Sequence, residues 1–232
     1  MLDVCTDREY LETNEYALAK AREENILFNS KYRNWTIIRP YITYNDERLQ
    51  LGVFEKENWL YRALNKKTIV FPKDIAEKYT TLTYGYDVAK VMAELIGNKK
   101  AFGEAFHIAT EQVIKWADVL QLYLEVIERE LGYRPNVYMP KNSKQLGEIC
   151  GNKYQISLDR LYDRRFSNKK VKWALGHDVL YMDVCEGLNQ CLTNFIRSNK
   201  DFRDDAIGVH TEAYFDKLTG DKDTLKYFPP FK

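Results

Sequence analysis

Tyr16 and Lys20 are the residues of this sequence whose types and spacing best suit chemistry. Positions four apart on a helix lie on one face, so the lysine ammonium comes close to the tyrosine phenol. That positive charge favours the phenolate and lowers the tyrosine pKa from about 10 toward neutral. A tyrosine tuned in this way can take a proton from a sugar hydroxyl, or return one, during hydride transfer. The alternative interpretation is that both are ordinary surface residues of an amphipathic helix.

A second pair with the same spacing, Tyr86 and Lys90, lies at the start of another predicted helix. The chain has 17 tyrosines, so matches to this spacing are expected by chance. We interpret Tyr86 and Lys90 as a coincidence. The order of the motifs along the chain, and not the spacing, has to separate the two pairs.

The cysteines and histidines show no spacing that suits a metal ion or a redox pair. There is no Cys-x-x-Cys motif among Cys5, Cys150, Cys185 and Cys191. We therefore expect free thiols in a reducing cytoplasm and no metal site.

The charge balance argues against several classes of partner. Lys and Arg number 35 and Asp and Glu 34, which gives a net charge of +1. This leaves no electrostatic footprint for nucleic acid or for an anionic membrane. No apolar run is long enough to span a bilayer, and the first ten residues contain no signal-peptide core. We expect a cytoplasmic protein that binds neither nucleic acid nor membranes.

The chain of 232 residues alternates between helix-like and strand-like segments. Apolar residues at helical spacing predict helices at 12–28, 87–96, 116–131 and 184–196. Short apolar runs predict strands at 35–40 (WTIIRP), 68–72 (TIVFP) and 105–109 (AFHIA). This alternation predicts the α/β class, with parallel strands.

The sequence also gives one prediction for the start of the first helix and one for the end of the chain. Thr13 is a suitable cap for the helix at 12–28. After Ser198 the chain becomes charged and ends in the aromatic and proline-rich residues 227–231. We expect residues 199–232 to form an irregular tail packed on the surface.

The motifs follow one another in a recognisable order. The Tyr16–Lys20 helix leads to the strand WTIIRP, and later come the segments 84–89 (YGYDVA), 103–109 (GEAFHIA) and 162–176 (YDRRFSNKK to LG). This order resembles the extended short-chain dehydrogenase/reductase family, in its NAD-dependent nucleotide-sugar epimerase/dehydratase branch, over roughly residues 9–196. The resemblance implies a partial Rossmann-like parallel sheet, with the late strands and helices only, and a smaller α/β substrate-binding region. Residues 1–198 would be a remnant of the dinucleotide fold interleaved with that region.

By this resemblance, Tyr16 is the catalytic acid/base, and Lys20 is its partner and a ligand of the nicotinamide ribose. Pro40 and Tyr41, just after the strand WTIIRP, border the nicotinamide. The implied cofactor is NAD or NADP.

The resemblance also implies a substrate, a nucleotide-diphosphate sugar. Tyr44 and Asn45 fall where the family has a substrate loop. Arg164 and Arg165 are candidates for binding the diphosphate, because arginine binds phosphate in a forked geometry. The alternative is that these two arginines form a solvated surface pair.

The departures from the family concern the cofactor. The family begins with a glycine-rich turn that holds the pyrophosphate, whereas the first glycine here is Gly52 and only 15 residues precede Tyr16. The catalytic Ser or Thr that the family places well upstream is also missing, because Thr6 and Thr13 lie too close to Tyr16. We therefore expect an amino-terminally truncated protein that is catalytically incomplete alone.

Without the earlier strands, the strand WTIIRP would have an open edge. We expect a partner to cover it, either a chain that supplies the missing half or a second copy. Two other functions stay open: a module that binds a nucleotide-sugar without chemistry, and an inert or purely interacting protein.

Overall fold

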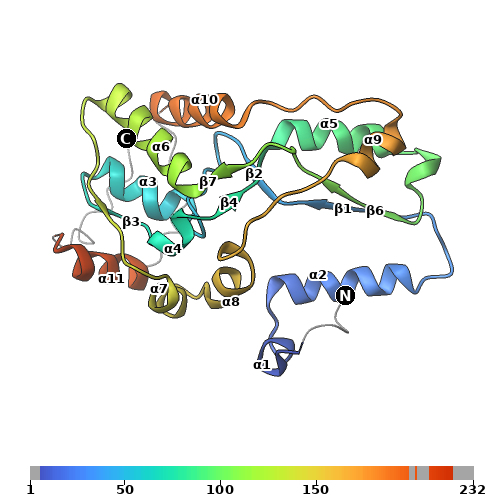
Figure 1. Ribbon diagram of the computed structural model, residues 1–232, viewed down its shortest axis with the longest axis horizontal. Coiled ribbons are helices and arrows are strands. Elements are labelled where there is room, and N and C mark those ends of the chain that lie inside the picture. The colour runs from blue at the N-terminus through green and yellow to red at the C-terminus, as the bar shows by residue number, and fades with distance from the viewer. Residues whose placement is uncertain (1–5, 199–201, 203–208, 222–232) are drawn as a thin grey trace.

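The structure is a computed structural model that describes residues 6–198, 202 and 209–221. It is a mixed α/β fold with short parallel ladders, so the predicted fold class is confirmed. Figure 1 shows helices on both sides of the paired strands β1 and β6, with α5 and α9 on one side and α2 on the other.

The elements follow one another along the chain in the order of their labels. The strands are β1 (Thr36–Pro40), β2 (Ile42–Tyr44), β3 (Ile69–Val70), β4 (Tyr79–Thr80), β5 (Leu82–Tyr84), β6 (Glu104–Ile108), β7 (Ile114–Lys115) and β8 (Val137–Tyr138). The longer helices are α2 (Tyr16–Phe28), α3 (Lys56–Leu64), α5 (Gly85–Leu95), α6 (Trp116–Leu131), α9 (Lys169–Leu175), α10 (Val184–Arg197) and α11 (Val209–Thr219). The short helical turns are α1 (Arg8–Leu11), α4 (Lys73–Ala76), η2 (Lys99–Ala101), α7 (Lys144–Ile149), α8 (Lys153–Gln155) and the π-helical η3 (Ile156–Arg160).

Within the described part of the chain, the strands pair in four ladders of two. Three are parallel, β1 with β6, β2 with β5 and β3 with β8, and β4 pairs with β7 antiparallel. The longest ladder runs from Thr36 opposite Glu104 to Pro40 opposite Ile108. The predicted strands at 35–40, 68–72 and 105–109 are confirmed as β1, β3 and β6.

Helices α6 and α10 pack together and form part of the main core. The predicted bounds of α6 are confirmed at both ends, and Gly132 ends it with a positive φ of 74°, where a side chain would be strained. The apolar face of α6 includes Tyr123, whose ring stacks on that of Trp59 at 4.4 Å. These contacts fix the larger core, to which α3, α6 and α10 all contribute.

The first predicted helix is wrong at its start, because α2 begins at Tyr16 and not at residue 12. Glu12 ends the short helix α1, and the Glu15 carboxylate accepts a hydrogen bond from Ala17 N at 2.7 Å. Thr13 does not cap α2; its hydroxyl donates to Tyr10 O and accepts from Glu15 N within the turn. A carboxylate at the start of a helix also suits the helix dipole.

The expectation of an irregular surface tail is wrong for residues 209–221, which include α11. Phe215 of α11 lies in the main core, with 1% of its surface exposed. The aromatic residues 227–231 lie outside the described residues, and the proposed division at residue 198 stays a prediction.

Among the described residues, no helix combines the length and the apolar character needed to cross a membrane.

Candidate functional site

Tyr16 and Lys20 lie together on the exposed surface of α2. The Lys20 ammonium is 5.7 Å from the centre of the Tyr16 ring, and 73% of Tyr16 is exposed. Lys20 also donates to Glu23 Oε2 at 2.8 Å, and this hydrogen bond raises the lysine pKa. The structure therefore brings the two residues together with the lysine charged, and Glu23 shares that charge.

Contacts with β1 hold α2 in place. Arg39 Nε donates to Glu24 Oε1 at 2.8 Å, and the rings of Phe28 and Trp35 meet edge to face at 5.3 Å. In Figure 1, α2 runs opposite to β1, so the start of α2 lies toward the carboxyl end of β1. Open α/β sheets bind ligands at the carboxyl ends of their strands, so α2 begins near the expected site.

Tyr41 follows Pro40 at this carboxyl end and is half-buried. Its hydroxyl donates to Asp159 Oδ2 at 2.8 Å, and its ring lies 4.9 Å from that of Phe166. Burial raises the pKa of Tyr41, although nearby arginines oppose the shift. Tyr41 is therefore a neutral donor at neutral pH.

Arg164 joins Tyr41 through the same carboxylate. Its Nε donates to Asp159 Oδ1 at 2.5 Å, and its Nη2 donates to Leu158 O at 2.7 Å. Arg165 points elsewhere, with its guanidinium 4.8 Å from the centre of the Tyr79 ring. The two candidate arginines therefore have different surroundings, because Arg164 is half-buried and bound to Asp159 whereas Arg165 is exposed.

Asp159 and Arg160, at the end of the π-helical turn η3, were not predicted from the sequence. Arg160 is buried, donates from Nε to Gly52 O at 3.0 Å, and pairs with Asp159. A π-helical turn often marks a functional site, but no periodic pattern in the sequence signals one. The adjacent Asp and Arg shortly before Arg164 were the available clue.

Tyr44 and Asn45 have partners other than the two arginines. Tyr44 is buried with 2% exposed, its ring is 5.7 Å from that of Tyr84, and its hydroxyl has no hydrogen-bond partner among the described residues. Burial raises the pKa of Tyr44 strongly. Asn45 stabilises a turn by accepting from the backbone N of Glu47 and Arg48, both at 2.9 Å.

The second Tyr-x-x-x-Lys pair has nearly the same local geometry as the first. Lys90 lies 5.3 Å from the centre of the Tyr86 ring and pairs with Asp87 at 2.7 Å. Local geometry therefore does not separate Tyr86 and Lys90 from Tyr16 and Lys20. The difference is the helix that carries them, α5 in one case and α2 in the other.

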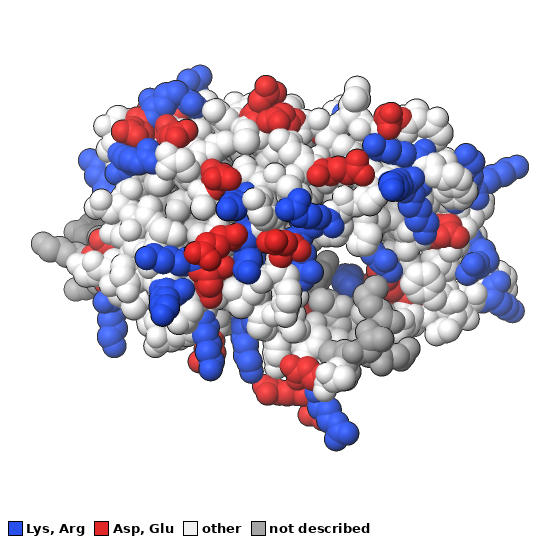
Figure 2. Space-filling model, viewed as in Figure 1, with Lys and Arg blue, Asp and Glu red and all other residues white. Residues whose placement is uncertain are grey.

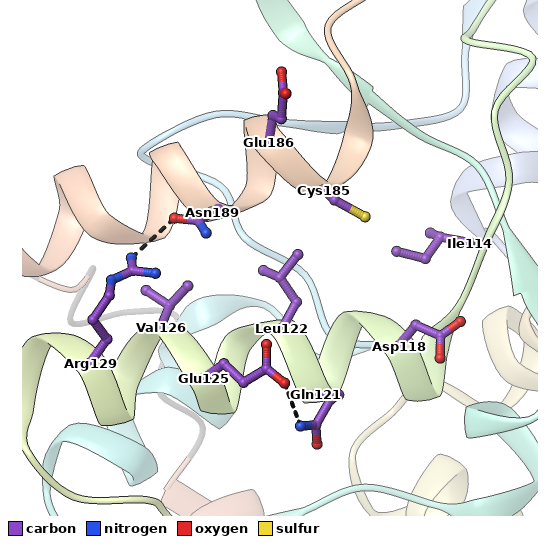
Figure 3. Close-up of a pocket in the computed structure, with 10 residues that line it drawn as sticks. All are labelled: Ile114, Asp118, Gln121, Leu122, Glu125, Val126, Arg129, Cys185, Glu186 and Asn189. Carbon is purple, nitrogen blue, oxygen red and sulfur yellow. Dashed lines mark hydrogen bonds between the residues drawn. The ribbon is translucent and has the colours of Figure 1, made fainter.

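A groove of about 450 Å³ lies between α6 and α10, as Figure 3 shows. Its walls carry Asp118, Glu125, Glu186, Arg129 and Cys185. None of the predicted site residues lines this groove. On the face shown in Figure 2, residues of both charge signs are interspersed, and no single-sign patch dominates that face.

The sequence matches no protein-family model and no curated protein. Solved structures share its fold. An epimerase from Methanothermobacter thermautotrophicus is 15% identical, with a TM-score of 0.57, over 79% of this chain and 48% of that one. UDP-glucose 4-epimerase from Thermotoga maritima, solved with UDP-glucose, is 16% identical, with a TM-score of 0.54, over 79% and 53%.

A third structure, UDP-glucuronic acid 4-epimerase from Bacillus cereus, was solved with UDP-glucuronic acid and NAD. It is 14% identical, with a TM-score of 0.50, over 71% of this chain and 46% of that one. The chain spans about half the length of these structures. At such low identity the likeness establishes the Rossmann-like fold and leaves activity to proposal.

Proposed function

We propose that this chain is part of an NAD-dependent enzyme that epimerises or dehydrates a nucleotide-diphosphate sugar. The observation that carries the proposal is the exposed pair of Tyr16 and Lys20 on α2, in a fold shared with nucleotide-sugar epimerases. Arg39 and Glu24 hold this helix against β1. The pair therefore sits on an anchored helix, with its phenol open to a substrate.

In this proposal Tyr16 exchanges a proton with a sugar hydroxyl. The charged Lys20 stabilises the phenolate that forms when Tyr16 gives up its proton, and it also binds a ribose hydroxyl. NAD, when bound, supplies hydride transfer at the sugar carbon. Pro40 and Tyr41 border the nicotinamide.

The substrate side of the proposal rests on residues after β2 and η3. Arg164 binds the diphosphate through its guanidinium fork, and Arg165, whose guanidinium lies over the Tyr79 ring, stays the candidate for a second contact. Asn45 borders the sugar, and the buried Tyr44 anchors the loop that carries it.

The described residues fit only one end of such a cofactor. Tyr16 and Lys20 suit the nicotinamide ribose, whereas no glycine precedes Gly52 to form a pyrophosphate-binding turn. We therefore propose that these residues do not bind the whole cofactor by themselves and are catalytically incomplete alone. A partner chain or a second copy would supply the remaining contacts.

A second candidate is a module that binds a nucleotide-sugar without chemistry. The observation that favours it is the cluster of Tyr41, Arg160 and Arg164, which this chain provides by itself. A diphosphate site of this kind needs no glycine-rich turn.

NADH binding to the purified chain, with and without UDP-glucose, tests the proposal. We expect Lys20→Gln to weaken NADH binding about tenfold, because it removes a charged hydrogen-bond donor to the ribose. Lys90→Gln is the matched control, since Lys90 has the same local geometry on another helix, and it should change nothing.

Binding of UDP-glucose without NADH binding up to millimolar concentration would favour the non-catalytic module. If neither ligand bound, both candidate functions would be wrong. Equal effects of Lys20→Gln and Lys90→Gln would remove the role proposed for α2.

A further inference from the structure

Asp159 connects three site residues through one carboxylate. It accepts from the Tyr41 hydroxyl at 2.8 Å and from Arg164 Nε at 2.5 Å, and it pairs with Arg160. Arg160 Nη1 also lies 3.3 Å from the Tyr41 hydroxyl. Three donors from two separate segments therefore converge on a single anionic group at the carboxyl end of β1.

The positive charges in this cluster exceed the negative charge. Two guanidinium groups face one carboxylate, and the neighbouring Arg48 and Glu55 pair with each other at 3.1 Å and cancel. Arg160 is 4% exposed, and desolvation lowers its pKa, so burial disfavours its charged form. An anion with more than one negative charge would suit the cluster better than Asp159 does.

Access to the cluster is asymmetric. Arg160 is buried and donates from Nε to Gly52 O at 3.0 Å. The side chains of Asp159 and Arg164, in contrast, are 25% and 32% exposed. The carboxylate can therefore turn toward water while both guanidinium groups stay in place. That movement would leave Arg160 and Arg164 converging on the same position.

We propose that Asp159 is an internal counterion that occupies the position of a diphosphate group, and that a diphosphate ester binds by displacing it from Arg160 and Arg164. The proposal deepens the function proposed above and rests on it for the source of the diphosphate. A diphosphate offers more acceptor oxygens and more charge than one carboxylate, so it can engage both guanidinium forks at once. Asp159 then sets the threshold for binding, since every ligand has to compete with it.

Calorimetric titration with inorganic pyrophosphate tests this competition. Asp159→Asn keeps an acceptor for Tyr41 and removes the competing charge. We expect pyrophosphate to bind about tenfold more tightly, because it no longer has to replace a charge-assisted contact between Asp159 and the arginines. Arg164→Gln should abolish the gain. Glu128→Gln is the matched control. It removes the carboxylate of an exposed ion pair with Arg134, so the affinity for pyrophosphate should not change.

Tyr41→Phe provides a second variant, since it removes one hold on Asp159 and leaves both arginines. We expect it to raise pyrophosphate affinity by less than Asp159→Asn does. Unchanged or weaker binding in both folded variants, with folding checked by thermal melts, would overturn the proposal. Absence of pyrophosphate binding to wild type and to both variants would overturn it as well.

Parallel titrations with UDP-glucose and NADH identify the source of the diphosphate. Tighter binding of UDP-glucose to Asp159→Asn assigns the site to a sugar nucleotide, and tighter binding of NADH assigns it to the dinucleotide. Either result supports the counterion role. The pyrophosphate result does not depend on Tyr16 or Lys20, so failure of the counterion and failure of the proposed enzyme activity can be told apart.

Discussion

Gly187 lies inside helix α10, where glycine destabilises a helix by about 1 kcal/mol relative to alanine. The side chain of Tyr44 explains its presence. A Cβ at position 187 would lie 2.1 Å from the Tyr44 hydroxyl oxygen and 2.9 Å from Met182 Cγ. Helical spacing in the sequence predicted α10, but the reason for a glycine within it comes from a residue more than 140 positions earlier.

Gly187→Ala should destabilise the protein by about 1–2 kcal/mol, because overpacking outweighs the gain in helix propensity. In a Tyr44→Phe background the same substitution should cost less, since the nearest oxygen is gone. A double-mutant cycle from urea unfolding measures the difference. Equal costs in the two backgrounds would show that Tyr44 is not the cause.

In the candidate site too, the sequence predicts which residues are neighbours on one helix but not which distant segments meet. The positions of Tyr16 and Lys20 on one face followed from their spacing, and the structure brings them together as expected. Asp159 and Arg160 could not be found in the same way, because their partner Tyr41 lies 118 positions away from Asp159 in sequence. Such pairing is set by how η3 packs at the end of β1, which no local pattern records.

Helix α11 docks on α3 through a buried group of charges. Arg62, fully buried, contacts Glu212 Oε2 and Asp216 Oδ1, each at 2.8 Å. Lys67 pairs with Asp216 at 2.8 Å. In the sequence these charges look like a solvated surface and predict an irregular tail, whereas in the fold they pair with one another.

The stability that α11 contributes should depend on pH through Glu212. Burial raises the pKa of Glu212, although Arg62 and Lys67 oppose the shift. A folded-state pKa above the unfolded value of about 4.3 means that this contribution is fully present below that value and is lost as pH rises through the folded pKa. Glu212→Gln, which mimics the protonated form, should therefore gain stability relative to wild type as pH rises.

Urea midpoints of both proteins between acid and neutral pH check this expectation, with Glu128→Gln as an exposed control. The result depends on whether the midpoint of Glu212→Gln rises or falls relative to that of wild type as pH increases. If wild type gained on Glu212→Gln as pH rose, attraction by Arg62 would outweigh desolvation in this cluster.

The other elements were predicted to different degrees. Strong helical periodicity gave α6 and α10, because their apolar faces pack against the main core. Helix α2 was misplaced at its start, because its apolar residues show no clear face. Within α2, which the structure describes in full, Leu18 is the single buried residue.

At the scale of the whole molecule, the β1–β6 ladder with α2 stands out as sparsely covered. Among the described residues, β1 pairs with β6 and with no other strand. The neighbouring helix α2 carries three exposed apolar or aromatic residues. Tyr16 is 73% exposed, Ile26 is 71% exposed and Phe28 is 44% exposed. An open strand edge beside exposed apolar side chains favours association with another chain.

We expect light scattering at micromolar concentration to give a mass above the 27.4 kDa of one chain. Ile26→Lys should shift the sample toward the monomer, because it places a charge on the exposed face of α2. Ile96→Lys is the control, since Ile96 is 82% exposed at the end of α5. A monodisperse monomer for the wild-type chain would contradict the expected association.

The distance in sequence between Arg62 and its carboxylate partners also sets an order of events during synthesis. Arg62 meets Glu212 and Asp216 about 150 positions later in the chain. While the ribosome is still making the preceding helices, the guanidinium group has no such partners and must stay in water. The part of the main core to which Phe215 contributes can therefore close only after α11 has emerged.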